Sequence, residues 1–133
     1  MVDRLVTAGI AKLSQGAIIV DLEAEKFGVF LILRSDGTAL YATTDLPLAL
    51  RKFRDYKLDA SLYVVDVRQK LHFAQLFAVL KRMGYTQEFT HVAYEFVTLP
   101  EGAMASRKGT IIRYDDFWTE MYKRTSEVTR GRH

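Results

Sequence analysis

The amino-terminal third of the chain alternates short apolar runs with turns. Apolar residues near one helical face predict a helix over residues 2–14. Two apolar runs follow at residues 17–22 and 29–33, and Asp36-Gly37 precedes a third at 39–42. Asp-Gly between apolar runs is a strong hairpin signal, because both central residues of a type I′ turn need a positive φ. These runs predict an antiparallel meander that ends at residue 42.

The apolar period then changes to that of a helix. Leu46, Ala49, Leu50 and Phe53 recur at the i, i+3, i+4, i+7 spacing. Pro47 suits the first turn, where a missing N–H needs no helical partner. The expected helix cap is Thr43, Thr44 or Asp45. This segment therefore predicts an amphipathic helix directly after the meander.

Strands and helices alternate in the remaining sequence. The continuous apolar run at residues 62–65 predicts a strand covered on both faces. A helical stripe runs from Phe73 to Met83, with Gly84 placed to end the helix. A strand over 91–97, a short strand over 110–113 and a helix from Asp115-Asp116 follow. The alternation predicts an α/β fold with a parallel sheet, whose functional sites lie at the carboxyl ends of the strands.

Composition limits the classes to which the protein can belong. A length of 133 residues with 49% hydrophobic residues suits one packed domain, expected over residues 1–133. No cysteine is present, which excludes a disulfide scaffold or a thiolate metal site. No apolar run is long enough to span a membrane, so a cytoplasmic protein without membrane contact is expected. The net charge of +3 permits phosphate contact without demanding it.

Several common site patterns are absent from the sequence. The three histidines lie far apart and lack ligand spacing, so no metal site is expected. The sequence has no Gly-x-Gly-x-x-Gly fingerprint and no Walker A loop. No order of Ser, His and Asp suggests a hydrolase. The chemistry must therefore be sought in other residues.

Three stretches carry a resemblance to a known family. Residues 35–45 look like its SDGT-x-LYAT-x-D segment, and residues 63–73 look like the strand and helix entry that follow, with a Gln and a His-Phe pair. Residues 96–104 lead into a Gly- and Lys-bearing loop at 104–109 that resembles the nucleotide-facing KMSKS-like loop. In order, spacing and identity, the chain resembles arginyl-tRNA synthetases, which are class I aminoacyl-tRNA synthetases, over about residues 16–118.

The resemblance implies a partial Rossmann-like fold, the carboxyl-side half of the catalytic domain. Residues 1–42 would form a helix and meander insertion, and residues 43–133 the α/β half with the KMSKS-like loop. The implied function is part of an arginine–tRNA ligase, with ATP-dependent activation of L-arginine and transfer to tRNA(Arg). ATP is then a substrate accompanied by Mg²⁺, and no tightly bound cofactor is expected.

The resemblance also implies residue roles. Tyr41 and Asp45, four apart across a strand-to-helix turn, would read the guanidinium, and Gln69 would hold the α-amino end of arginine. A carboxylate reads a guanidinium bidentately. The implied nucleotide-binding residues are His72, Met104, Ser106 and Gly109. Arg107 and Lys108 would neutralise the ATP phosphates while the arginine carboxylate attacks the α-phosphate and pyrophosphate leaves.

Each residue also has an ordinary structural interpretation. Asp45 suits a helix cap, Tyr41 a half-buried strand aromatic, and Gln69 a helix start. His72 alone is more often a surface or core histidine, and Lys108 a solvated lysine. Their joint occurrence in register favours a site.

The sequence departs from the family at two places. The His-x-Gly-His turn that packs on the nucleotide is absent, and position 105 is Ala where the family usually has Ser. The isolated chain is therefore expected to be inactive without a complementary amino-terminal half. The alternative is a catalytically inactive paralogue or remnant that binds arginine or a protein partner. An exposed sheet edge also predicts a homo-oligomer.

Overall fold

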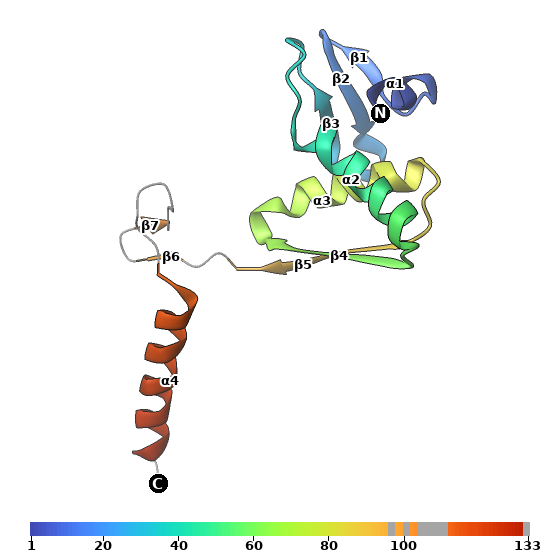
Figure 1. Ribbon diagram of the computed structural model, residues 1–133. Helices are drawn as coiled ribbons and strands as arrows, with labels where there is room; N and C mark the ends of the chain where they lie inside the picture. Colours follow the sequence, from blue (N-terminus) through green and yellow to red (C-terminus); the bar gives the residue numbers. More distant parts are fainter. Residues whose placement is uncertain (96–97, 100–101, 104–111, 132–133) are drawn as a thin grey trace. The chain divides into compact units, whose positions relative to one another are not determined.

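The amino-terminal helix is shorter than its apolar spacing predicts. The computed structural model describes residues 1–95, 98–99, 102–103 and 112–131, and helix α1 covers only Val2–Thr7 (Figure 1). Gly9 takes a φ of +69°, and the N–H of Ile10 donates to the Leu5 carbonyl at 2.9 Å. A left-handed glycine with this backbone bond ends a helix. The predicted helix over 2–14 is therefore wrong beyond Thr7.

An antiparallel sheet of three strands follows. It has the order β1-β2-β3, with strands β1 (Lys12–Ser14), β2 (Ala17–Leu22) and β3 (Gly28–Leu33). A short 3₁₀ turn, η1 (Glu23–Glu25), joins the last two strands. Val20 pairs with Phe30 across the ladder, and both side chains are buried. The predicted meander is confirmed as far as residue 33.

The predicted third run, at 39–42, does not form a strand. Only one bridge, between Leu33 and Ala39, continues the ladder. Gly37 has a φ of +81° and its N–H donates to the Arg34 carbonyl at 3.0 Å, while Asp36 is not among the residues with positive φ. This is the geometry of a three-residue hairpin loop with one left-handed glycine, so the predicted type I′ turn is wrong.

Helix α2 (Tyr41–Tyr56) begins where the third strand was expected. Its N-cap residue is Leu40, whose N–H donates to the Thr43 hydroxyl oxygen at 3.0 Å. The Thr43 hydroxyl in turn donates to the carbonyl of Ile32 in β3. Thr43 thus caps from inside the first turn, and Pro47 lies in the helix interior instead of the first turn. The N-cap residue is therefore not one of the three predicted, and the predicted place of Pro47 in the first turn is wrong.

The second sheet is a parallel pair. Strands β4 (Ala60–Asp66) and β5 (Glu88–Tyr94) run from Ala60 opposite Glu88 to Asp66 opposite Tyr94. The connection passes through the 3₁₀ turn η2 (Val67–Gln69) and helix α3 (Lys70–Arg82). Leu62 and Val64 are 64% and 66% exposed, so within the unit Met1–Glu95 strand β4 is covered on one face only. The expectation of two covered faces is wrong for this part of the chain.

Two helices separate the sheets. Helices α2 and α3 lie between the three-stranded sheet and the β4–β5 pair (Figure 1). The α3 stripe is buried as predicted, and Gly84 at a φ of +89° ends this helix. The core combines both helices with the two sheets; its largest fully buried side chains are Leu5, Val20, Leu22, Ile32, Leu46, Leu76, Val79 and Leu80. Three layers around one core fit an α/β unit.

The remaining elements belong to a second unit. The chain divides into Met1–Glu95 and Phe96–His133, and each is described by itself. In the second unit, β6 (Thr98–Leu99) and β7 (Gly102–Ala103) pair antiparallel. Helix α4 (Tyr114–Arg130) has both predicted aspartates in its first turn and buries none of its residues. The predicted strand at 110–113 falls partly outside the described residues, and the single domain over 1–133 stays a prediction.

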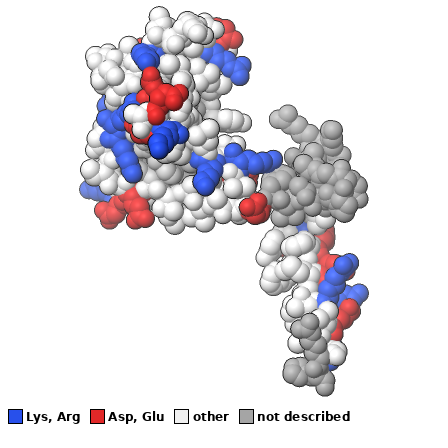
Figure 2. Space-filling view, turned by 180° about the vertical axis from the view of Figure 1, so that it is seen from behind, with Lys and Arg blue, Asp and Glu red and all other residues white. Residues whose placement is uncertain are grey.

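Charges are mixed over the surface of the first unit. Figure 2 shows Lys and Arg side chains interspersed with Asp and Glu on the face in view. Several charged side chains of the first unit are paired, for example Lys12 with Asp21 at 2.8 Å. This face therefore carries no continuous basic patch. None of the described helices is both long and apolar enough to cross a membrane.

Candidate functional site

Four of the predicted site residues line one hollow. It has a volume of about 160 Å³ and lies where β4 ends and helices α2 and α3 begin. Its lining residues are Tyr41, Asp45, Val65, Gln69, His72 and Phe73. The carboxyl end of a parallel strand is the usual place for a site in an α/β sheet. Residues from separate sequence stretches thus lie together around this hollow.

Helix α2 places Tyr41 and Asp45 together. Both belong to this helix, so their spacing of four residues puts them on one face, one turn apart. The sequence prediction placed them across a strand-to-helix turn, which is wrong in detail. Tyr41 is 77% exposed, whereas the Asp45 side chain is 29% exposed. The phenol therefore stands at the mouth of the hollow and the carboxylate deeper inside.

Asp45 contacts His72 across the hollow. The His72 Nε2 and Asp45 Oδ2 atoms are 2.8 Å apart. A carboxylate can only accept, so Nε2 carries the hydrogen in this bond. The imidazole also packs against Phe30 at 5.7 Å and Phe73 at 5.3 Å between ring centroids. This contact therefore links helix α2, through Asp45, to helix α3, through His72.

The turn after β4 positions Gln69. Asp66 is the N-cap of η2, and its Oδ1 accepts the backbone N–H of Arg68 at 3.0 Å. The Arg68 guanidinium donates to both Asp66 oxygens, at 2.8 and 3.1 Å. The Arg68 hydrogen bond holds the pKa of the Asp66 carboxyl below its usual value. This clamp fixes the turn whose last residue, Gln69, lines the hollow and is the N-cap of α3.

Apolar side chains form the walls that the sequence reasoning missed. Val65 comes from β4, and Phe73, assigned only to the core, also lines the hollow. His91 of β5 supports both, since its Nε2 lies 2.9 Å from the Val65 carbonyl and its ring 4.8 Å from that of Phe73. The place of Val65 near the carboxyl end of a predicted strand was the available signal. Burial raises the pKa of the nearby Tyr63, and the Asp45 charge adds to the effect.

The loop residues predicted to bind nucleotide cannot be placed. They lie outside the described residues: Met104, Ser106, Arg107, Lys108 and Gly109. The structure therefore brings together the predicted arginine-reading residues and His72. Among the described residues no group of three or more His, Asp or Glu side chains is arranged to hold a metal ion.

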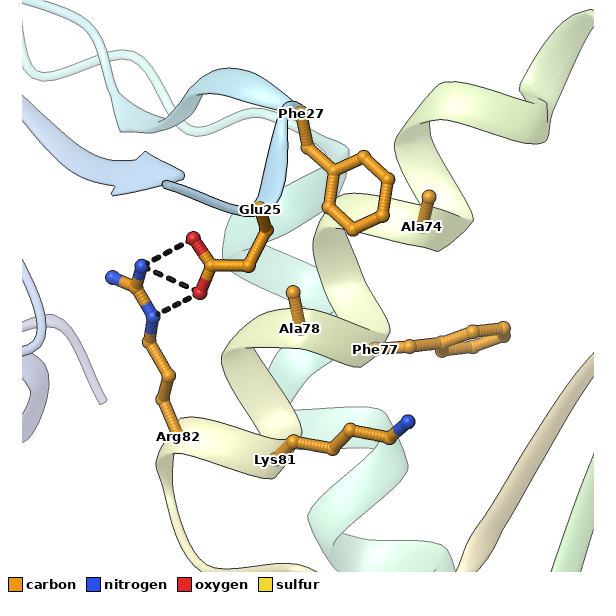
Figure 3. Close-up of a pocket in the computed structure, with 7 residues that line it drawn as sticks. All are labelled: Glu25, Phe27, Ala74, Phe77, Ala78, Lys81 and Arg82. Carbon is orange, nitrogen blue, oxygen red and sulfur yellow. Dashed lines mark hydrogen bonds and ion pairs between the residues drawn. The ribbon is translucent and has the colours of Figure 1, made fainter. Parts of the chain in front are cut away.

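A larger hollow lies toward the carboxyl end of α3. Its volume is about 540 Å³, and Figure 3 shows Phe27 and Phe77 beside Ala74 and Ala78, with the Arg82–Glu25 pair at the rim. Arg82 Nε donates to one Glu25 oxygen at 2.8 Å and Nη2 to the other at 2.7 Å. The guanidinium is already paired and the remaining lining is mainly apolar. The smaller hollow, where polar groups converge, is therefore the better candidate site.

Comparison with known protein families agrees with the resemblance seen in the sequence. The family model for "tRNA synthetases class I (R), catalytic domain" matches residues 1–132. The chain belongs to this family. The family resemblance inferred from the three sequence stretches is thereby confirmed.

The curated arginyl-tRNA synthetases to which this chain is similar are much longer than the chain itself. It is 53% identical over 113 residues to the arginine–tRNA ligase of Bdellovibrio bacteriovorus, covering 84% of this chain and 20% of the relative. It is 38% identical over 130 residues to that of Clostridioides difficile, covering 96% of this chain and 23% of the relative. The chain thus spans about a fifth of the length of these relatives.

Solved structures support the fold. The crystal structure of arginyl-tRNA synthetase from Plasmodium falciparum matches with a TM-score of 0.68 at 19% identity, covering 98% of this chain and 21% of that one. A putative arginyl-tRNA synthetase from Campylobacter jejuni matches with a TM-score of 0.59 at 12% identity, covering 72% and 22%. The α/β fold predicted for the family is confirmed.

Proposed function

We propose that this chain supplies the arginine-reading part of the activation site of an arginine–tRNA ligase. The observation that carries the proposal is the hollow lined by Tyr41, Asp45, Gln69 and His72. Membership of the arginyl-tRNA synthetase family supports the assignment.

The chemistry of the hollow suits arginine. A guanidinium is a planar cation whose parallel N–H groups fit one carboxylate, here Asp45. The methylene stem of arginine is apolar and suits walls formed by Val65 and Phe73. Tyr41 at the mouth offers a hydroxyl, and Gln69 offers an amide to the α-amino end. Lysine presents a single point of charge and matches this arrangement less well.

Activation would use parts beyond this hollow. The arginine carboxylate attacks the α-phosphate of ATP and pyrophosphate leaves; the arginyl group of the resulting adenylate then passes to tRNA(Arg) as AMP is released. Arg107 and Lys108 would neutralise phosphate charge together with Mg²⁺. A His-x-Gly-His turn is not among these residues and would be needed to complete the site, so these residues alone are expected to be inactive. Other partners proposed are tRNA(Arg) and a second copy of this chain.

The second candidate is an arginine-binding protein without catalysis. The observation that favours it is that Tyr41, Asp45 and Gln69 line one hollow within the unit Met1–Glu95, to which the KMSKS-like loop at 104–109 does not belong. Pyrophosphate exchange separates the two functions. The chain is mixed with a Bdellovibrio ligase that lacks its matching fifth, and arginine-dependent exchange of labelled pyrophosphate into ATP is measured. Exchange supports the ligase, and arginine binding without exchange supports the binding protein.

The binding step has its own test. Arginine, lysine and the neutral isostere citrulline are titrated into the chain and followed by NMR. Arginine should bind at least about tenfold more tightly than the others, and Asp45→Asn should remove this preference. Asp55→Asn, on the same helix but outside the hollow, is the matched control and should retain the preference. Absence of arginine binding at millimolar concentrations would contradict the proposal.

A further inference from the structure

The contact between Asp45 and His72 suggests a role for the histidine that differs from its predicted nucleotide contact. We infer that His72 is a positioning residue, which orients the Asp45 carboxylate toward the hollow and thereby sets the preference for a forked cation. The inference rests on the proposed function, because it concerns how the same hollow reads arginine. It assigns to His72 an action through Asp45 and no contact with the nucleotide.

Asp45 needs an orienting partner. Its side chain lies in the second turn of α2 and has rotatable bonds that an unheld carboxylate would sample. Among the described residues, the His72 bond at 2.8 Å is the one hydrogen bond to this carboxylate. A charge-assisted bond of this length is strong enough to favour one rotamer. The direction of Asp45 is therefore set by the other helix.

The His72 ring is itself held in place. It lies in the first turn of α3, and its side chain is only 19% exposed. Phe30 packs on the imidazole from β3 and is 3% exposed, while Phe73 meets the imidazole edge-on. These two rings limit rotation of the imidazole. The donor at Nε2 therefore points in a direction that the core determines.

The hydrogen bond from His72 leaves the Asp45 carboxylate able to accept two parallel N–H groups of a guanidinium. His72 occupies one lone pair of Oδ2, so Oδ1 and the second lone pair of Oδ2 remain. Two parallel N–H groups of a guanidinium need one site on each oxygen. A freely rotating carboxylate would serve an ammonium as well as a guanidinium. Fixing it favours the planar cation, and His72 is therefore specificity-determining.

Two variants separate positioning from packing. His72→Phe keeps an aromatic ring beside Phe30 and Phe73 but has no donor. His72→Gln places an amide N–H near the position of Nε2 and restores a donor. The affinities of each chain for arginine, lysine and citrulline are measured by NMR titration. Thermal unfolding of each variant shows whether the fold is kept.

The expected result is selective. His72→Phe should weaken arginine binding by about tenfold while citrulline binding changes less than about twofold. His72→Gln should recover most of the arginine affinity. If His72→Phe binds arginine as tightly as the parent chain, the positioning role is overturned and the proposed function stands. If the parent chain itself binds no arginine, the proposed function fails first, and positioning for arginine fails with it.

A spectroscopic signature tests the contact without any ligand. The His72 ring N–H should give a proton signal that exchanges slowly enough to be observed, and Asp45→Ala should abolish it. Persistence of the signal in Asp45→Ala would overturn the inference, because the donor would then have another acceptor. This measurement tests the contact on which the inference depends even if His72→Phe does not fold.

Discussion

Single residues of the candidate site were predictable where their chemistry is unusual. Tyr41, Asp45 and Gln69 were predictable because their order and spacing resemble those of the arginyl-tRNA synthetase family. Phe73 and Val65 were missed as lining residues, since an apolar side chain in a wall looks the same in sequence as one in the core. The His72–Asp45 bond joins residues 27 positions apart, so only folding reveals it.

The Asp66–Arg68 clamp makes stability depend on pH. The Arg68 bond lowers the pKa of the Asp66 carboxyl below 3.8, the ordinary value for an aspartate. The unfolded chain therefore binds a proton at a higher pH than the folded one, and acid favours unfolding. The contribution of Asp66 is present above pH 3.8 and is lost as the pH falls through the lower folded-state pKa. Asp66→Asn should be less stable than the parent chain at neutral pH and should approach it in acid.

Urea unfolding at pH 7 and at pH 3 measures this difference. Asp3→Asn is the control, because Asp3 makes no side-chain hydrogen bond or ion pair with the described residues. A gap between parent and Asp66→Asn that is constant across this pH range would contradict the assignment.

Secondary structure was predictable where the helical spacing of apolar residues and a glycine at the end of that segment indicate the same helix. The α3 stripe and its end at Gly84 followed from the sequence, because buried positions and a left-handed glycine both leave local signals. The start of α2 did not follow, since residues 39–42 read as an apolar strand. The bond from Thr43 to Ile32, a contact between elements, fixes that boundary.

The Arg82 guanidinium joins helix α3 to β2 and η1, which are distant from it in sequence. Arg82 binds Glu25 through two nitrogens and donates from Nη1 to the Asp21 carbonyl at 2.7 Å. Lysine cannot reproduce this fork. Because both side chains of the pair are 33% exposed, Arg82→Lys should cost only about 0.5–1 kcal/mol in the free energy of unfolding.

Arg51→Lys provides the comparison for that measurement. Arg51 is 75% exposed and pairs with Asp55 within the same helix, so its replacement should cost less than about 0.5 kcal/mol. Equal losses for the two variants in urea unfolding would show that the Arg82 fork adds nothing to the junction of α3 with the first sheet.

At the scale of the whole molecule, the outer face of β4–β5 is apolar and is not covered by other residues of the unit Met1–Glu95. Leu62, Val64, Val92 and Tyr94 are 64%, 66%, 43% and 52% exposed. The sequence predicted a covered strand because the apolar run suits burial on both faces. The chain spans about a fifth of the length of its curated relatives.

This face is expected to drive self-association of the isolated chain. Light scattering should show a mass that rises with protein concentration, and Val64→Lys should lower it by placing a charge on the patch. Lys26→Glu, away from this face, changes charge without touching the patch and serves as the control. A monomer at every concentration would contradict the prediction.

The start of α2 has a consequence for motion. Pro47 has no N–H to offer the Thr43 carbonyl, so one rung of the helical ladder is missing just beyond Asp45. The Thr43 hydroxyl, held by Ile32, compensates by pinning this turn to the sheet. The first two turns of α2, which carry Tyr41 and Asp45, are thus expected to open locally when the Thr43 hydrogen bond breaks, while the later turns stay helical.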